Sequence, residues 1–90
     1  MGLDAYIAEQ NEKVEILRNL LDHYNDGRQK SFFCIAVNLL GLQDVRDIMA
    51  RISVETSIEM PVKEKSKTAV RLFQNMADER GVSLKLRRKG

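Results

Sequence analysis

Apolar and polar residues at the start of the chain alternate with the spacing of an α-helix. Apolar positions recur every seven residues in two offset series, which predicts an amphipathic helix over residues 3–24. Tyr6 and Leu20 widen the apolar stripe beyond a narrow coiled-coil seam, so we expect this face to lie on a globular core. The two series are Ile7, Val14 and Leu21, and Leu3, Gln10, Leu17 and Tyr24, with Gln10 the one polar member.

The next element is almost wholly apolar. Between Phe32 and Leu40 only Asn38 is polar, and a helix that is apolar on every side is expected at the centre of a core. The preceding Asn25-Asp26-Gly27 predicts a chain reversal, with Asp26 or Ser31 as the helix cap. Gly41 is expected to end the helix in a left-handed conformation.

A third helix is predicted over residues 44–51, and the pattern then changes to strict alternation. Apolar or β-branched residues fall on every second position from Ile52 to Met60, which predicts a strand. Pro61 suits the start of a helix over 62–80, and Gly81 suits its end. Val82, Leu84 and Leu86 alternate again, which predicts a second strand over 82–87.

These elements together predict a single α+β domain that covers residues 1–90. The three N-terminal helices would pack with the buried apolar one at the centre, and a strand-helix-strand unit would form a small sheet with two parallel strands. Because two strands are marginally stable alone, the sheet would need helices to cover it or a second copy to extend it by dimerisation.

Composition places the chain among ordinary globular proteins. Of its 90 residues 43% are hydrophobic and 31% are charged, which argues against disorder. Cys34 is the only cysteine, so no disulfide can form within the chain and a reducing, cytoplasmic setting is expected. The longest apolar run is well short of the ~20 residues that span a bilayer, so no membrane partner is expected.

The net charge of +2 conceals two halves of opposite sign. Residues 1–60 hold six Lys/Arg and ten Asp/Glu, whereas residues 61–90 hold nine and three. Basic residues on the last helix and the C-terminal tail would contact phosphates without reading base sequence. The candidate anion- or nucleic-acid-binding residues are Lys63, Lys67, Arg71, Arg87, Arg88 and Lys89. Their alternative role is a solvated surface.

Candidate catalytic chemistry is sparse. His23 is the only histidine, so it has no second histidine with which to build a metal site, and Cys34 within the apolar run is expected to pack as a small hydrophobe. Asp44 and Asp47 cancel Arg46 and Arg51, which argues against a DNA-reading helix-turn-helix. We therefore expect no catalytic residues, no cofactor and no metal.

Two functional hypotheses follow from the sequence. The first is a non-enzymatic protein-interaction or regulatory module whose partner is another protein or a second copy of itself, joined through the first helix or the sheet edge. The alternative is a weakly sequence-selective nucleic-acid-binding protein that uses the basic last helix and tail.

Overall fold

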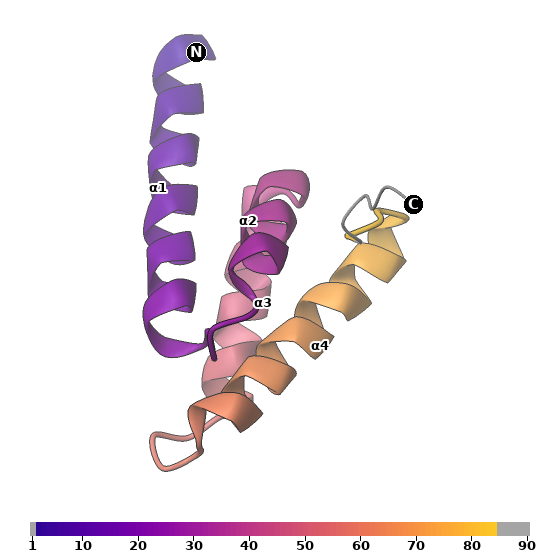
Figure 1. Ribbon diagram of the computed structural model, residues 1–90. Coiled ribbons are helices and arrows are strands. Elements are labelled where there is room, and N and C mark those ends of the chain that lie inside the picture. Colours follow the sequence, from indigo (N-terminus) through magenta and orange to yellow (C-terminus); the bar gives the residue numbers. More distant parts are fainter. Residues whose placement is uncertain (1, 85–90) are drawn as a thin grey trace.

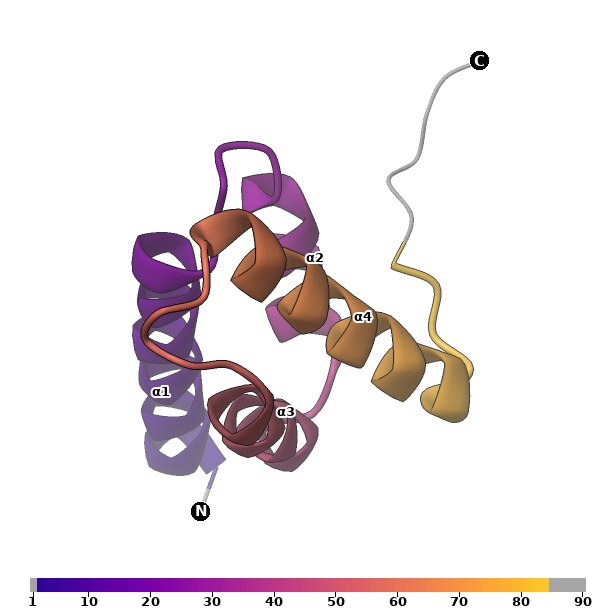
Figure 2. The ribbon, with the colours of Figure 1, turned by 90° about the horizontal axis from the view of Figure 1, so that it is seen from below.

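The chain folds into a bundle of helices in the computed structural model, which describes residues 2–84. The helices are α1 (Gly2–His23), α2 (Lys30–Leu39), α3 (Leu42–Glu55) and α4 (Val62–Arg80). Figure 1 shows α1, α2 and α3 running alternately down and up, with α4 crossing them obliquely. Seen from below, α2 and α4 lie on one side of the bundle, with α3 opposite and α1 along the edge (Figure 2).

The predicted α+β fold is wrong, because residues 2–84 contain helices and no strand. The first predicted strand, 52–60, begins inside α3, which continues to Glu55. Val45, Ile48 and Ile52 are spaced three and four apart and are all buried, so the helical period extends through Ile52. Val54 and Ile58, which should have faced the core of a strand, are 84% and 91% exposed.

The second predicted strand is also absent from the residues that the structure describes. The helix before it ends at Gly81, as predicted, with φ 69° in the left-handed region. Gly81 N–H donates to the Asp78 carbonyl and Val82 N–H to the Ala77 carbonyl, at 3.2 and 2.9 Å, which is a Schellman motif. The chain then turns back and buries Leu84 without regular structure, and residues 85–90 lie outside the described residues.

The turn predicted at residues 25–27 is confirmed, but the helix caps around it differ from expectation. Asn25 Oδ1 accepts hydrogen bonds from the N–H groups of Gly27 and Gln29, both at 3.1 Å. Gln29, rather than Asp26 or Ser31, precedes the first turn of α2, and no side chain caps it. Gly41 has φ −69°, so it is not the left-handed residue that was expected, and it precedes α3 instead.

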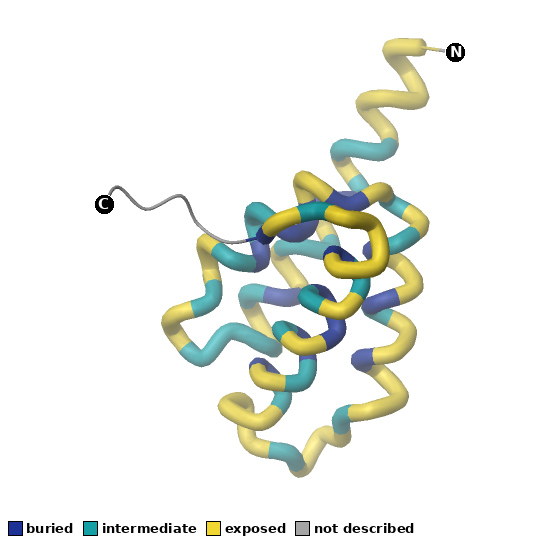
Figure 3. Tube along the Cα trace, turned by 90° about the vertical axis from the view of Figure 1, so that its right-hand side faces the viewer, coloured by how far each residue is buried: buried dark blue, intermediate teal, exposed yellow. Residues whose placement is uncertain are grey.

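The core lies where α2, α3 and α4 meet the lower half of α1. Phe33 and Phe73 are fully buried with their ring centroids 6.0 Å apart, and Phe32 packs against both. Asn38 and Leu39 of α2 are exposed, so this helix is not enclosed on every side as its composition suggested. Figure 3 shows the buried residues gathered inside the bundle and the N-terminal turns of α1 projecting beyond it.

Candidate interaction surface

Two polar contacts join α1 to its neighbouring helices. Lys13 is 7% exposed, and its ammonium donates a 3.0 Å hydrogen bond to the carbonyl of Leu40 at the end of α2. The adjacent Glu12 accepts two hydrogen bonds of 2.6 and 2.7 Å from the guanidinium of Arg46 on α3. On the same side of α1, Leu20 is fully buried in the core and Ile16 is partly buried against it.

The heptad series of α1 is divided between the surface and the core. Leu3, Ile7 and Val14 are 71%, 46% and 53% exposed, whereas Leu17 and Leu21 are partly buried against the core. We call these five residues the α1 stripe. The sequence predicted that this face, widened by Tyr6 and Leu20, would lie on the core. Leu17, Leu20 and Leu21 do pack there, whereas Leu3, Ile7 and Val14 stay exposed.

The lower part of the α1 stripe is hollowed. A hollow of about 250 Å³ is lined by Val14, Leu17, Arg18, Leu21 and Asp22, and its surface is mainly apolar. The upper part of the stripe, with Leu3 and Ile7, lies on the turns of α1 that extend past α2 and α3 (Figures 1 and 3). The stripe therefore combines a projecting apolar end with an apolar hollow on one helix.

The charged residues on the two edges of α1 differ in their contacts. On the α3 side, the Arg46 guanidinium beside Glu12 lowers the pKa of that carboxyl below its ordinary value, chiefly through their hydrogen bonds. On the opposite side, Asp4, Asn11 and Arg18 follow one another at heptad spacing next to the stripe, and all three are exposed. Among the described residues, no ion pair involves Asp4 or Arg18.

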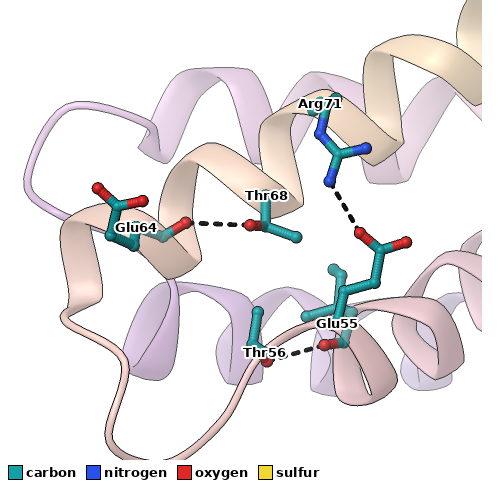
Figure 4. Close-up of polar contacts among 6 residues, drawn as sticks. Glu55, Thr56, Glu64, Thr68 and Arg71 are labelled. Atoms are coloured by element: carbon teal, nitrogen blue, oxygen red, sulfur yellow. Dashed lines mark hydrogen bonds and ion pairs between the residues drawn. The ribbon is translucent and has the colours of Figure 1, made fainter.

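The basic residues predicted to bind anions are only partly described. Lys63, Lys67 and Arg71 are exposed, and their spacing of four places them along one edge of α4. Arg71 reaches across to α3, where its Nη2 donates to Glu55 Oε1 at 2.8 Å (Figure 4). The other predicted members, Arg87, Arg88 and Lys89, lie outside the described residues, so the structure does not place them beside α4.

A second hollow lies between α3 and α4 and has a mixed lining. It measures about 320 Å³, with Ile48, Leu72 and Met76 as its apolar residues and with Asp47, Arg51, Asn75 and Glu79 as its polar ones. Within residues 2–84, no group of three His, Cys, Asp or Glu side chains is placed to share a metal ion. Cys34 is half-buried on α2, and His23 is exposed with its ring edge against Tyr24.

No protein-family model, curated protein or solved structure matches this chain. None of the helices in the described part of the chain is both long and apolar enough to cross a bilayer. The surface features above therefore carry the functional argument alone.

Proposed function

We propose that this protein is a small non-enzymatic interaction module that associates with a second copy of itself through the α1 stripe. The observation that carries the proposal is a heptad-spaced apolar stripe in which Leu3, Ile7 and Val14 are exposed and Leu17 and Leu21 are only partly buried. Exposed apolar residues grouped along one helix face are typical of interaction sites, since burying each Å² of apolar surface is worth ~25 cal/mol.

The exposed apolar residues outside α1 are not grouped along one helix face. Val54, Ile58 and Val62 lie around the connection between α3 and α4, and only Val54 and Val62 are on helices. Leu39 is a single exposed leucine at the end of α2. They do not share one helix face, whereas the α1 stripe continues over three heptads of a single helix. A long helical stripe gives a partner helix a regular series of contacts.

Sedimentation velocity over a range of micromolar concentrations tests this proposal. We expect the wild type to form dimers as its concentration rises and Val14→Glu to stay monomeric, because a carboxylate would lie in the middle of the stripe. Val54→Glu is the matched control, since Val54 is a helical valine that is 84% exposed on α3. A monomeric wild type, or equal loss of dimer in both variants, would contradict the proposal.

The alternative is a nucleic-acid-binding role through the basic residues of α4 and the tail, and it has weaker support. Exposed Lys63 and Lys67 could contact phosphates, but Arg71 is already paired with Glu55. Binding to duplex DNA that weakens steeply as salt increases would favour this role, because each neutralised phosphate adds about 0.9 to the slope of log affinity against log salt.

A further inference from the structure

The heptad spacing of the α1 stripe allows it to pair with the α1 of a second copy in an antiparallel arrangement. In such a pair, each member of one heptad series faces a member of the other series on the second helix. One register brings Leu3 opposite the partner's Leu21, Ile7 opposite the partner's Leu17 and Gln10 opposite the partner's Val14. All three pairs share one centre, level with position 12 of α1, so a single two-fold axis there repeats every contact.

In this register, the hollow on α1 lies opposite Ile7 of the second copy. Val14, Leu17, Arg18 and Leu21, which line it, have the spacing of the four residues that form a hole for a side chain of the facing helix. Ile7 of the second copy would enter this hole, and Leu3 would follow against Leu21. Each projecting end of α1 would thereby cover the hollow of the other copy.

The charges beside the stripe are complementary in the same register. The flanking series Asp4, Asn11 and Arg18 would face its own copy, with Asp4 beside the partner's Arg18 and Asn11 beside the partner's Asn11 at the two-fold axis. A parallel pair would instead bring this series beside the series of Tyr6, Lys13 and Leu20. In that arrangement Arg18 would lie beside the partner's Lys13, which has the same charge, so the parallel pair has no matching charges to use.

We infer that the second copy binds antiparallel, with its α1 crossing at position 12 and with two Asp4–Arg18 ion pairs between the chains. The inference rests on the proposed self-association and adds the orientation and register of the partner. The contact is small, in the class below ~1,200 Å² of total buried surface, so the dimer is expected to be in exchange with monomer.

Charge reversal tests the orientation. Asp4→Arg and Arg18→Asp each place like charges together at both ends of the interface, so each should weaken dimerisation by about tenfold in sedimentation equilibrium. The double variant Asp4→Arg/Arg18→Asp restores opposite charges and should return to within about twofold of the wild-type dissociation constant. Glu59→Arg, an exposed reversal in the connection between α3 and α4, is the control for net charge and should retain the wild-type constant.

The outcomes separate this inference from the proposed function. If the wild type dimerises and Val14→Glu abolishes it, but the two reversals have no effect or the double variant shows no recovery, the antiparallel register is wrong and self-association stands. A wild type that stays monomeric overturns both. Circular dichroism of each variant confirms that the helices are retained, so that a loss of dimer reports on the interface.

Discussion

Lys13 and Ser66 are the two buried polar side chains among the described residues, and only Lys13 has a hydrogen-bond partner. Lys13 covers an end carbonyl of α2 while its apolar stem packs between helices. Ser66 on α4 is 1% exposed, and its Oγ has no hydrogen-bond partner. A buried hydroxyl without a partner loses its bonds to water and gains none within the protein.

Replacing Ser66 by alanine should therefore stabilise the protein. We expect Ser66→Ala to raise the free energy of unfolding by about 1 kcal/mol, because it removes the unpaired hydroxyl and improves helix propensity. Ser53→Ala is the matched control, since Ser53 is an exposed serine within α3 and reports propensity alone. Urea denaturation of both variants measures the difference, and a larger gain for Ser53→Ala would show that the Ser66 hydroxyl is not costly.

Two glycines, Gly41 and Gly81, lie at helix ends in different backbone conformations. Gly81 ends α4 with a positive φ, and its two backbone hydrogen bonds start the segment that brings Leu84 onto the core. Gly41 lies between α2 and α3 with an ordinary negative φ, so any residue could adopt its conformation. The two glycines look alike in the sequence, but only Gly81 requires the freedom that glycine has.

Gly81→Ala should lower the free energy of unfolding by about 1 kcal/mol, because alanine is strained at φ 69°. Gly41→Ala is expected to be neutral or slightly stabilising, since it restricts the unfolded chain without straining the folded one. No atoms lie within 4 Å of an added Cβ at either site, so crowding does not enter the comparison. Thermal melts of the two variants should differ in sign or size, and equal losses would refute this account.

Three ion pairs between helices act on the stability of the bundle as a whole. Glu12 joins α1 to Arg46 of α3, and Asp44 of α3 joins Arg80 of α4, both with two hydrogen bonds. The hydrogen bonds from Arg80 lower the pKa of Asp44, as those from Arg46 lower the pKa of Glu12. The third pair, between Arg71 and Glu55, also ties α4 to α3.

These lowered pKa values predict a specific loss of stability in acid. A carboxyl whose folded-state pKa is depressed stabilises the fold above its ordinary pKa, here 4.5 for Glu12 and 3.8 for Asp44, and this contribution is lost as pH falls through the folded-state pKa. The double variant Glu12→Gln/Asp44→Asn should therefore be less stable at neutral pH and lose less stability on acidification.

Urea midpoints measured from neutral pH down to about pH 2 test this expectation. Replacing the partners, Arg46→Gln/Arg80→Gln, should reduce the neutral-pH stability in the same direction. Because exposed ion pairs are screened by salt, the difference from wild type should also shrink in concentrated salt. If the double carboxyl variant loses as much stability in acid as the wild type, the loss is caused by groups other than Glu12 and Asp44.

Helices with a strong apolar period were predictable from sequence, and elements with an ambiguous period were not. The expected helix over 62–80 coincides with α4, and that over 3–24 differs from α1 by one residue at each end. The alternation from Ile52 to Met60 is typical of a strand, but Ile52 also continues the helical spacing of Val45 and Ile48. Tertiary packing favours the helix, because an isolated strand has no neighbour to pair with, whereas α3 buries Ile52 in the core.

The heptad series of α1, the apolar run of α2, the turn at Asn25 and the stop at Gly81 followed from the sequence alone, because each depends on residues that are close along the chain. Which face of α1 stays at the surface was decided only by the tertiary structure. Leu20 is buried in the core, and Lys13 and Glu12 contact Leu40 and Arg46, each more than 25 positions away along the chain. No local pattern encodes such long-range contacts, so the sequence did not show that Leu3, Ile7 and Val14 would stay exposed.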